Sequence, residues 1–211
     1  MFNEYFNINL VEDEEIKTQT EKVEKKENQT IIKTVGNDSS LIYTTYSLMT
    51  KLNGNIRYYN LLQNNFEANM IIDGVYLGSL ESSYAKEELE RKGITHIVSV
   101  LAGYSPPYPN DFKYMVINAL DNQNSNLIDV FNDTSKFIID AISNDGNVLV
   151  HCAYGRSRSA TIVAAYLIDS YGMDVERIIK VLKGKRSIVE PNPYYLQQLF
   201  EYYKSKYDEM I

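Results

Sequence analysis

The feature that most constrains the fold of this chain is a short apolar segment that leads through a small polar loop into a longer apolar one. Residues 147–150 read Asn-Val-Leu-Val, as in a short buried strand, and residues 160–171 are strongly apolar and long enough for a helix. Strands that alternate with helices are typical of a parallel sheet. Ligands bind at the carboxyl ends of the strands in such sheets, so the loop after Val150 is the first place to look for chemistry.

The chain beyond residue 68 repeats the alternation of strands and helices. An Asp-Gly pair between two apolar runs predicts a hairpin, and stretches rich in β-branched residues predict strands. The expected elements are a hairpin over 70–77, strands over 94–101 and 114–120, and helices over 84–92, 127–142, 160–171, 174–182 and from 192 onward. The expected fold class is α/β, with a central, mostly parallel sheet flanked by helices.

Three regions are expected along the chain. Residues 1–40 are predicted to be a polar, charged N-terminal tail, because residues 12–29 cannot bury enough apolar area to offset their ordering entropy. The alternative for this stretch is a docking segment for a partner. Residues 41–68 are predicted to be a helical extension that packs on the domain, and residues 69–207 to be the main folded domain.

Charge and cysteine content exclude several functional classes. The 211 residues include 28 Asp and Glu against 21 Lys and Arg, a net charge of −7, so no nucleic-acid partner is expected. With one cysteine and two histidines, the chain is expected to have no internal disulfide, no metal site and no cofactor. We find no transmembrane segment of ~20 apolar residues and no signal peptide, which predicts a cytoplasmic or nuclear protein.

The loop before the apolar helix has the composition of an anion site. It reads His151-Cys-Ala-Tyr-Gly-Arg-Ser-Arg-Ser159, and backbone N–H groups at a helix start can bind a phosphate. A thiol here lies near the helix N-terminus and a guanidinium, which lowers its pKa, and Arg158 can grip two oxygens of a tetrahedral anion. A lone cysteine is more often a small buried hydrophobe. A thiol that faces a bound dianion instead predicts phosphoryl transfer through a covalent thiophosphate.

The segment His151-Cys-x₅-Arg158-Ser159 resembles the signature of cysteine-dependent protein phosphatases, and Ser157-Arg-Ser-Ala-Thr161 resembles their dual-specificity branch. The resemblance extends over about residues 69–203 and implies the compact α/β phosphatase domain. It includes Tyr76-Leu-Gly78, Gly93-Ile-Thr-His-Ile97, Arg186-Ser-Ile-Val-Glu-Pro-Asn192 and Gln198-Leu199. The family often has Gly-Phe where this chain has Tyr194-Tyr195, a difference that is not expected to affect catalysis.

The resemblance also implies roles for the residues of the loop. Cys152 would be the nucleophile, Arg158 would bind the phosphoryl group, and Ser159 would donate a hydrogen bond to the cysteine sulfur. His151 would order the loop and help to set the pKa of the thiol. The phosphate-binding residues between them would be Ala153, Tyr154, Gly155, Arg156 and Ser157.

The general acid implied by the resemblance is Asp121, on a loop between a strand and a helix upstream of Cys152. An acid is needed because a phosphate ester otherwise leaves as an alkoxide. The alternative is that Asp121 only caps a turn, since aspartate favours such positions. The other aspartates considered, Asp111, Asp129 and Asp133, fit less well. Asn192 is expected to have a supporting role near the phosphate loop.

The substrate class is less constrained than the reaction. The resemblance implies phosphotyrosine, phosphoserine and phosphothreonine in a phosphoprotein, because no long pocket-walling loop precedes Tyr76. Arg156 leaves an alternative, an anionic phospholipid or another non-protein phosphomonoester. A basic cluster supports the same alternative, unless it is only a solvated surface: Arg177, Lys180, Lys183, Lys185 and Arg186. An inactive phosphate-binding module is a third reading, opposed by the presence of Cys152, Arg158 and Asp121.

Overall fold

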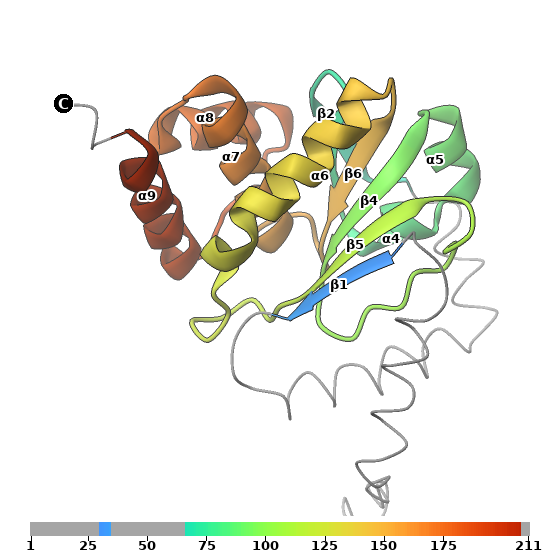
Figure 1. Ribbon diagram of the computed structural model, residues 1–211, viewed down its shortest axis with the longest axis horizontal. Coiled ribbons are helices and arrows are strands. Elements are labelled where there is room, and N and C mark those ends of the chain that lie inside the picture. Colours follow the sequence, from blue (N-terminus) through green and yellow to red (C-terminus); the bar gives the residue numbers. More distant parts are fainter. Residues whose placement is uncertain (1–29, 35–65, 208–211) are drawn as a thin grey trace, which may run out of the picture.

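A six-stranded sheet with the order β1-β5-β4-β6-β3-β2 forms the centre of the computed structural model, which describes residues 30–34 and 66–207 (Figure 1). β2 is antiparallel to β3, and the other neighbouring strands run parallel. The mostly parallel sheet confirms the predicted α/β class. The strands are β1 (Thr30–Thr34), β2 (Ala68–Ile72), β3 (Val75–Gly78), β4 (Ile94–Val100), β5 (Lys113–Asn118) and β6 (Asn147–His151).

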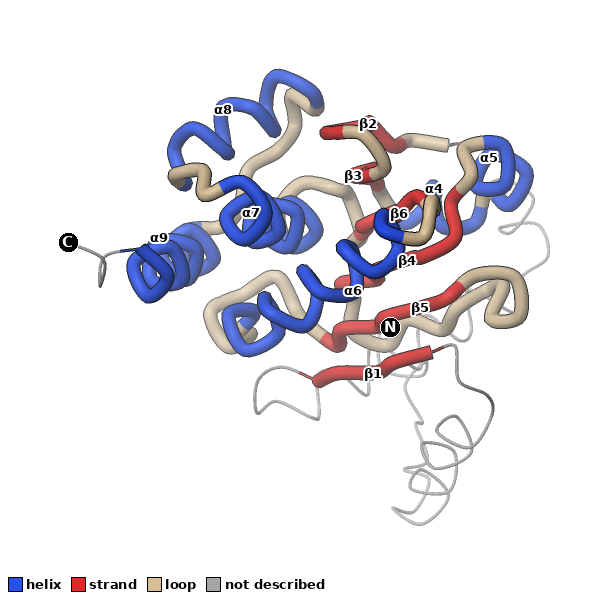
Figure 2. Tube along the Cα trace, turned by 45° about the horizontal axis from the view of Figure 1, so that its top comes forward, coloured by secondary structure: helices blue, strands red, loops and turns tan. Residues whose placement is uncertain are grey.

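Helices cover both faces of the sheet (Figure 2). One face carries α4 (Leu80–Tyr84) and α5 (Lys86–Arg91). The other carries the 3-10 turn η1 (Leu127–Val130), α6 (Phe131–Ser143), α7 (Arg158–Tyr171), α8 (Val175–Lys185) and α9 (Pro193–Tyr207). No helix of residues 66–207 is both long and apolar enough to cross a bilayer.

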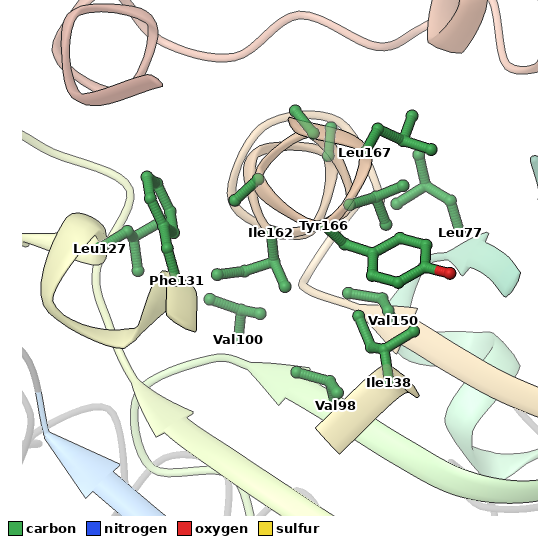
Figure 3. Close-up of a cluster of buried hydrophobic side chains, with 14 of the residues drawn as sticks. Leu77, Val98, Val100, Leu127, Phe131, Ile138, Val150, Ile162, Tyr166 and Leu167 are labelled. Atoms are coloured by element: carbon green, nitrogen blue, oxygen red, sulfur yellow. The ribbon is translucent and has the colours of Figure 1, made fainter. Parts of the chain in front are cut away.

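The alternation of side chains along the strands divides the apolar core into two layers. In β4, Val98 and Val100 pack in the layer of α6 and α7 (Figure 3), whereas Ile97 packs with Leu89 of α5. Successive side chains of a strand point to opposite faces, so a strand covered on both faces is apolar throughout. α7 packs against α6, α8 and α9 and is buried from Arg158 to Ile168, which explains why its sequence is apolar on every side.

The predicted hairpin, strands and helices are found, with ends that differ by a few residues. The hairpin consists of β2 and β3, and Gly74 turns it with a φ of 78°. Asp174 caps α8, where its carboxylate accepts the Arg177 N–H at 2.8 Å. The helix predicted over 84–92 corresponds to α5, and the additional five-residue helix α4 precedes it. A helix this short is hard to predict because it carries no periodic apolar pattern.

Strand β1 lies within the region predicted to be a polar tail. It adds a parallel edge to β5, with Thr30 opposite Tyr114, and Lys33 forms an ion pair with Asp133 of α6. The rest of the predicted tail, residues 1–29 and 35–40, lies outside the described residues. The predicted helical extension over 41–68 also lies outside them, except for residues 66–68, where Ala68 begins β2.

Candidate active site

The phosphate loop, residues 152–157, connects the end of β6 to the first residue of α7. β6 lies between β4 and β3, so the loop leaves the middle of the sheet at its carboxyl edge. Gly155 has a φ of 65°, and a Cβ at this position would lie 2.5 Å from the Gly78 carbonyl oxygen. Only glycine therefore allows the loop to turn this tightly against β3.

Cys152 is buried, and the Ser159 hydroxyl donates a hydrogen bond to its sulfur at 3.2 Å. Burial disfavours the thiolate and is the largest single influence on the pKa of Cys152. The charge of Arg158, the Ser159 hydroxyl and the backbone N–H groups of Ser159 and Arg156 together outweigh it. The pKa of the Cys152 thiol therefore lies below its ordinary value, which favours the nucleophilic form.

Arg158 connects the phosphate loop to the loop that follows β5. Its side chain is buried, Nη1 donates to the Ala119 carbonyl oxygen at 3.1 Å, and Nε lies 3.7 Å from Asp121 Oδ2. Nε makes no hydrogen bond within the described residues. A guanidinium carries five N–H donors, so donors remain for the oxygens of a phosphoryl group.

Asp121 lies in the second loop, and its side chain is 35% exposed. One carboxylate oxygen, Oδ1, accepts hydrogen bonds from Ser157 Oγ at 2.8 Å and Asn192 Nδ2 at 2.7 Å. The backbone N–H of Asn192 also donates to Ser157 Oγ, at 3.2 Å. Asn192 therefore contacts both loops and holds Asp121 beside the phosphate loop.

The other aspartates considered for the acid pair with residues elsewhere. Asp111 forms an ion pair with Lys86 at 3.0 Å, and Asp133 pairs with Lys33 of β1. Asp129 accepts a hydrogen bond from the Asn126 side chain. Of the aspartates considered, Asp121 is the one that the described structure brings against Arg158 and the phosphate loop.

His151 is fully buried and neutral. Burial lowers the pKa of the imidazole to about 3, and the nearby charge of Arg158 lowers it as well. The interaction with the Cys152 backbone acts in the opposite direction and raises the pKa. Its Nε2 and the Ser99 hydroxyl are 2.7 Å apart, and the Tyr104 ring packs edge-on against it. A group that stays uncharged near pH 7 is suited to ordering the loop and unsuited to carrying protons. His96 is likewise a buried core residue, packed against Phe137.

Arg186 supports the phosphate loop through hydrogen bonds to its carbonyl oxygens, a role that sequence reasoning missed. The sequence suggested a member of a basic surface cluster, but the side chain is only 5% exposed. Nε donates to the Gly155 carbonyl oxygen and Nη2 to that of Tyr154, both at 3.0 Å. Nη1 donates to the Asn69 side chain at 2.9 Å. These bonds tie the carbonyl oxygens of the loop to Arg186, and no residue spacing along the chain indicates them.

The remaining loop residues line the rim of the site. Arg156 forms an ion pair with Glu190, and both side chains are more than half exposed. The Glu190 N–H donates to the Arg156 carbonyl oxygen at 2.8 Å, so the segment after α8 runs beside the loop. Tyr154 is 74% exposed, and the Ala153 carbonyl oxygen accepts the Leu80 N–H. Arg156 therefore reaches the rim with its charge already paired.

The fold and the site together define a cysteine-dependent phosphatase. A low-pKa thiol, a loop of backbone N–H donors at a helix start and a buried guanidinium can bind a phosphate ester and attack it. A carboxyl group beside them can protonate the leaving oxygen. Within residues 30–34 and 66–207, no group of three or more His, Cys, Asp or Glu side chains is arranged to hold a metal ion.

Comparison with known proteins identifies the family. Residues 75–205 match the family model described as "Dual specificity phosphatase, catalytic domain", and the chain belongs to this family. It is 36% identical to Dual specificity protein phosphatase 1B of Arabidopsis thaliana over 152 residues, which cover 72% of this chain and 91% of that protein. It is 41% identical to Dual specificity protein phosphatase 22-A of Danio rerio over 143 residues, 67% of each chain.

Solved structures agree with this assignment. The crystal structure of DUSP15 superposes with a TM-score of 0.65 at 31% sequence identity, covering 69% of this chain and 93% of that one. The protein is therefore a cysteine-dependent protein phosphatase, as the resemblance implied.

Proposed function

We propose that this phosphatase acts on phosphotyrosine, phosphoserine and phosphothreonine of proteins, with Cys152, Arg158 and Asp121 as its catalytic residues. The observation that carries the proposal is the meeting of two loops around the buried thiol. Arg158 bonds to Ala119 and lies against Asp121, while Ser157 donates to the Asp121 carboxylate. Nucleophile, phosphate ligand and acid are thereby gathered at one point.

The first step forms a phosphocysteine. The Cys152 thiolate attacks phosphorus, a P–S bond forms, and the P–O bond to the substrate oxygen breaks. Arg158 and the backbone N–H groups of residues 153–157 hold the non-bridging oxygens, where negative charge must be stabilised. Asp121, protonated for this step, gives its proton to the departing oxygen, so that tyrosine, serine or threonine leaves as a neutral hydroxyl.

The second step returns the enzyme to its starting state. A water molecule attacks phosphorus, the P–S bond breaks, and the Cys152 thiolate and inorganic phosphate are released. Asp121, now ionised, takes a proton from the attacking water. The Ser159 hydroxyl, 3.2 Å from the sulfur, stabilises the departing thiolate. His151 orders the loop as a neutral residue, and Asn192 holds Asp121 in place.

A phosphoprotein is the substrate class that we favour. Glu190 pairs with Arg156, and this pairing reduces the attraction of the rim for a second phosphate or a lipid head group. The alternative, a phosphoinositide or other non-protein phosphomonoester, draws on the exposed cations of α8: Arg177, Lys180, Lys183 and Lys185. A catalytic thiolate needs a reducing compartment, and we propose the cytoplasm or the nucleus.

Turnover of phosphopeptides and phosphoinositides by one preparation tests the substrate class, and Cys152→Ser tests the mechanism. We expect phosphopeptides carrying each of the three phosphorylated residues to be the better substrates. Cys152→Ser should lose all turnover while it retains the fold and some affinity for phosphate, and a chelator should leave the unmodified enzyme active. Preferred turnover of phosphoinositides would support the alternative substrate. Undetectable turnover of every substrate would support an inactive module.

A further inference from the structure

Tyr195 of α9 contacts the loop that carries Asp121, although no sequence argument assigned it to the site. Its side chain is fully buried, and its hydroxyl donates to the Leu120 carbonyl oxygen at 2.5 Å. This oxygen belongs to the peptide group that joins Leu120 to Asp121. Because the peptide group is planar, holding the oxygen also fixes the backbone nitrogen and the Cα atom of Asp121.

The same residue is tied to the second contact of Asp121. The backbone N–H of Tyr195 donates to Asn192 Oδ1 at 2.9 Å, and Asn192 Nδ2 donates to Asp121 Oδ1 at 2.7 Å. The N–H of Leu120 is also held, by Ser125 Oγ at 3.0 Å. Asn192, just before α9, thus holds the carboxylate of Asp121, and Tyr195 in the first turn of α9 holds its backbone.

A third residue on this face of α9 extends the contact along the loop. Gln198 lies one turn beyond Tyr195, and its side chain donates to the Ser125 carbonyl oxygen and accepts the N–H of Ile128. Residues spaced by three on a helix lie on the same face. Among these contacts, the Tyr195 hydroxyl is the one that touches the peptide group next to Asp121.

The Tyr195 hydroxyl keeps its proton near neutral pH and can act as a donor there. Burial raises the pKa of the phenol well above its ordinary value, and the charge of Asp121 raises it further. The bond to Leu120 therefore persists when Asp121 changes between its protonated and ionised forms during turnover.

We propose that Tyr195 is a positioning residue for the general acid, acting through the Leu120–Asp121 peptide group. The inference rests on the proposed function, in which Asp121 protonates the leaving oxygen. It predicts that the phenol oxygen, and not the aromatic ring, contributes to acid catalysis. A phenylalanine at position 195 would keep the ring and could not supply the hydroxyl that bonds to Leu120.

The test is Tyr195→Phe, which keeps the buried ring and removes only the hydrogen bond. The matched control is Tyr202→Phe on the same helix, a buried tyrosine whose hydroxyl bonds to Asn132 and Asp169. The measured quantity is kcat/KM for two aryl phosphates, one with a poor leaving group (phenol) and one with a good leaving group (dinitrophenol). We expect Tyr195→Phe to lower kcat/KM for the phenyl ester about fivefold, the loss of one neutral hydrogen bond, and to leave the dinitrophenyl ester nearly unchanged.

Asp121→Asn separates this inference from the proposed function. If Asp121 is the acid, Asp121→Asn should lower kcat/KM selectively for the phenyl ester, and adding Tyr195→Phe to it should cause no further loss. A loss in Asp121→Asn that is equal for both esters would refute the proposed function. If Asp121→Asn lowers kcat/KM selectively for the phenyl ester but Tyr195→Phe gives the same kcat/KM values as Tyr202→Phe, only the inference is refuted. The proposal is overturned, and Tyr195 has a structural role, if Tyr195→Phe lowers kcat/KM equally for both esters or does not fold. A further loss in the double variant would have the same meaning.

Discussion

Replacing Ser159 by alanine isolates one of the interactions that ionise the nucleophile. Ser159 is fully buried, and its hydroxyl donates to the Cys152 sulfur at 3.2 Å. A thiolate accepts this bond far more strongly than a thiol, so its removal destabilises the ionised form. A hydrogen bond to a charged group contributes about 1.5–3 kcal/mol. A factor of ten in an equilibrium constant corresponds to about 1.4 kcal/mol, so ionisation of Cys152 should become about 10- to 100-fold less favourable and its pKa should rise in the variant.

The sign of this shift can be read from the reactivity of the thiol. Iodoacetamide alkylates the thiolate and not the thiol, so the rate of alkylation rises with pH around the pKa of Cys152. In the unmodified enzyme the midpoint should lie below that of an ordinary cysteine, because Arg158 and the backbone N–H groups lower the pKa. In Ser159→Ala the midpoint should move upward, and at neutral pH the alkylation should be slower.

A second buried hydroxyl provides the control. Thr134 of α6 is buried and donates to the carbonyl oxygens of Val130 and Phe131. Thr134→Val should leave the alkylation midpoint unchanged, even if it lowers the stability of the fold. An unchanged midpoint in Ser159→Ala, or an equal shift in both variants, would refute the reasoning that Ser159 stabilises the thiolate.

Three further predictions concern the rim, the support of the loop and the oxidation of the thiol. Arg156→Ala and Glu190→Gln should each change kcat/KM for phosphopeptides and aryl phosphates less than about threefold, since the two residues form an exposed ion pair. A tenfold or greater loss confined to phosphoinositides would support the non-protein alternative. Arg186→Met should lower the free energy of unfolding in urea by about 1–3 kcal/mol, because the buried Gly155 carbonyl loses its donor, and should weaken inhibition by phosphate. Unchanged values for both would contradict the supporting role of Arg186. Peroxide should inactivate the enzyme faster as pH rises toward the pKa of Cys152. Mass spectrometry should find a sulfenamide, a mixed disulfide or a disulfide between chains, because the chain has no second cysteine. An unmodified thiol in the inactivated protein would exclude this route.

Elements with a strong local pattern could be predicted from the sequence, and those without one could not. β4, β6 and α7 carry apolar runs that are buried on all sides, and they lie where these runs predict. The short helix α4 and the edge strand β1 were missed, because five residues contain too little periodicity. β1 in particular exists through its pairing with β5, a partner distant along the chain.

The sequence by itself determined the chemistry of the phosphate loop. Cys152, Arg158 and Ser159 follow one another within a single strand-loop-helix connection, and local geometry alone brings a thiol to the start of a helix. The same contiguous residues carry the signature part of the family resemblance, and the match to the family model extends over residues 75–205.

Only the tertiary structure decided how this loop is supported and how Asp121 is held. Arg186 bonds to a residue 31 positions away, and Tyr195 to one 75 positions away. Arg186 looked like one more surface cation, and Tyr195 like a harmless change from phenylalanine. Their roles arise because the packing of α8 and α9 on the sheet brings their donors to backbone carbonyls, and a contact with a carbonyl leaves no preferred residue type at the other end by which the sequence could reveal it.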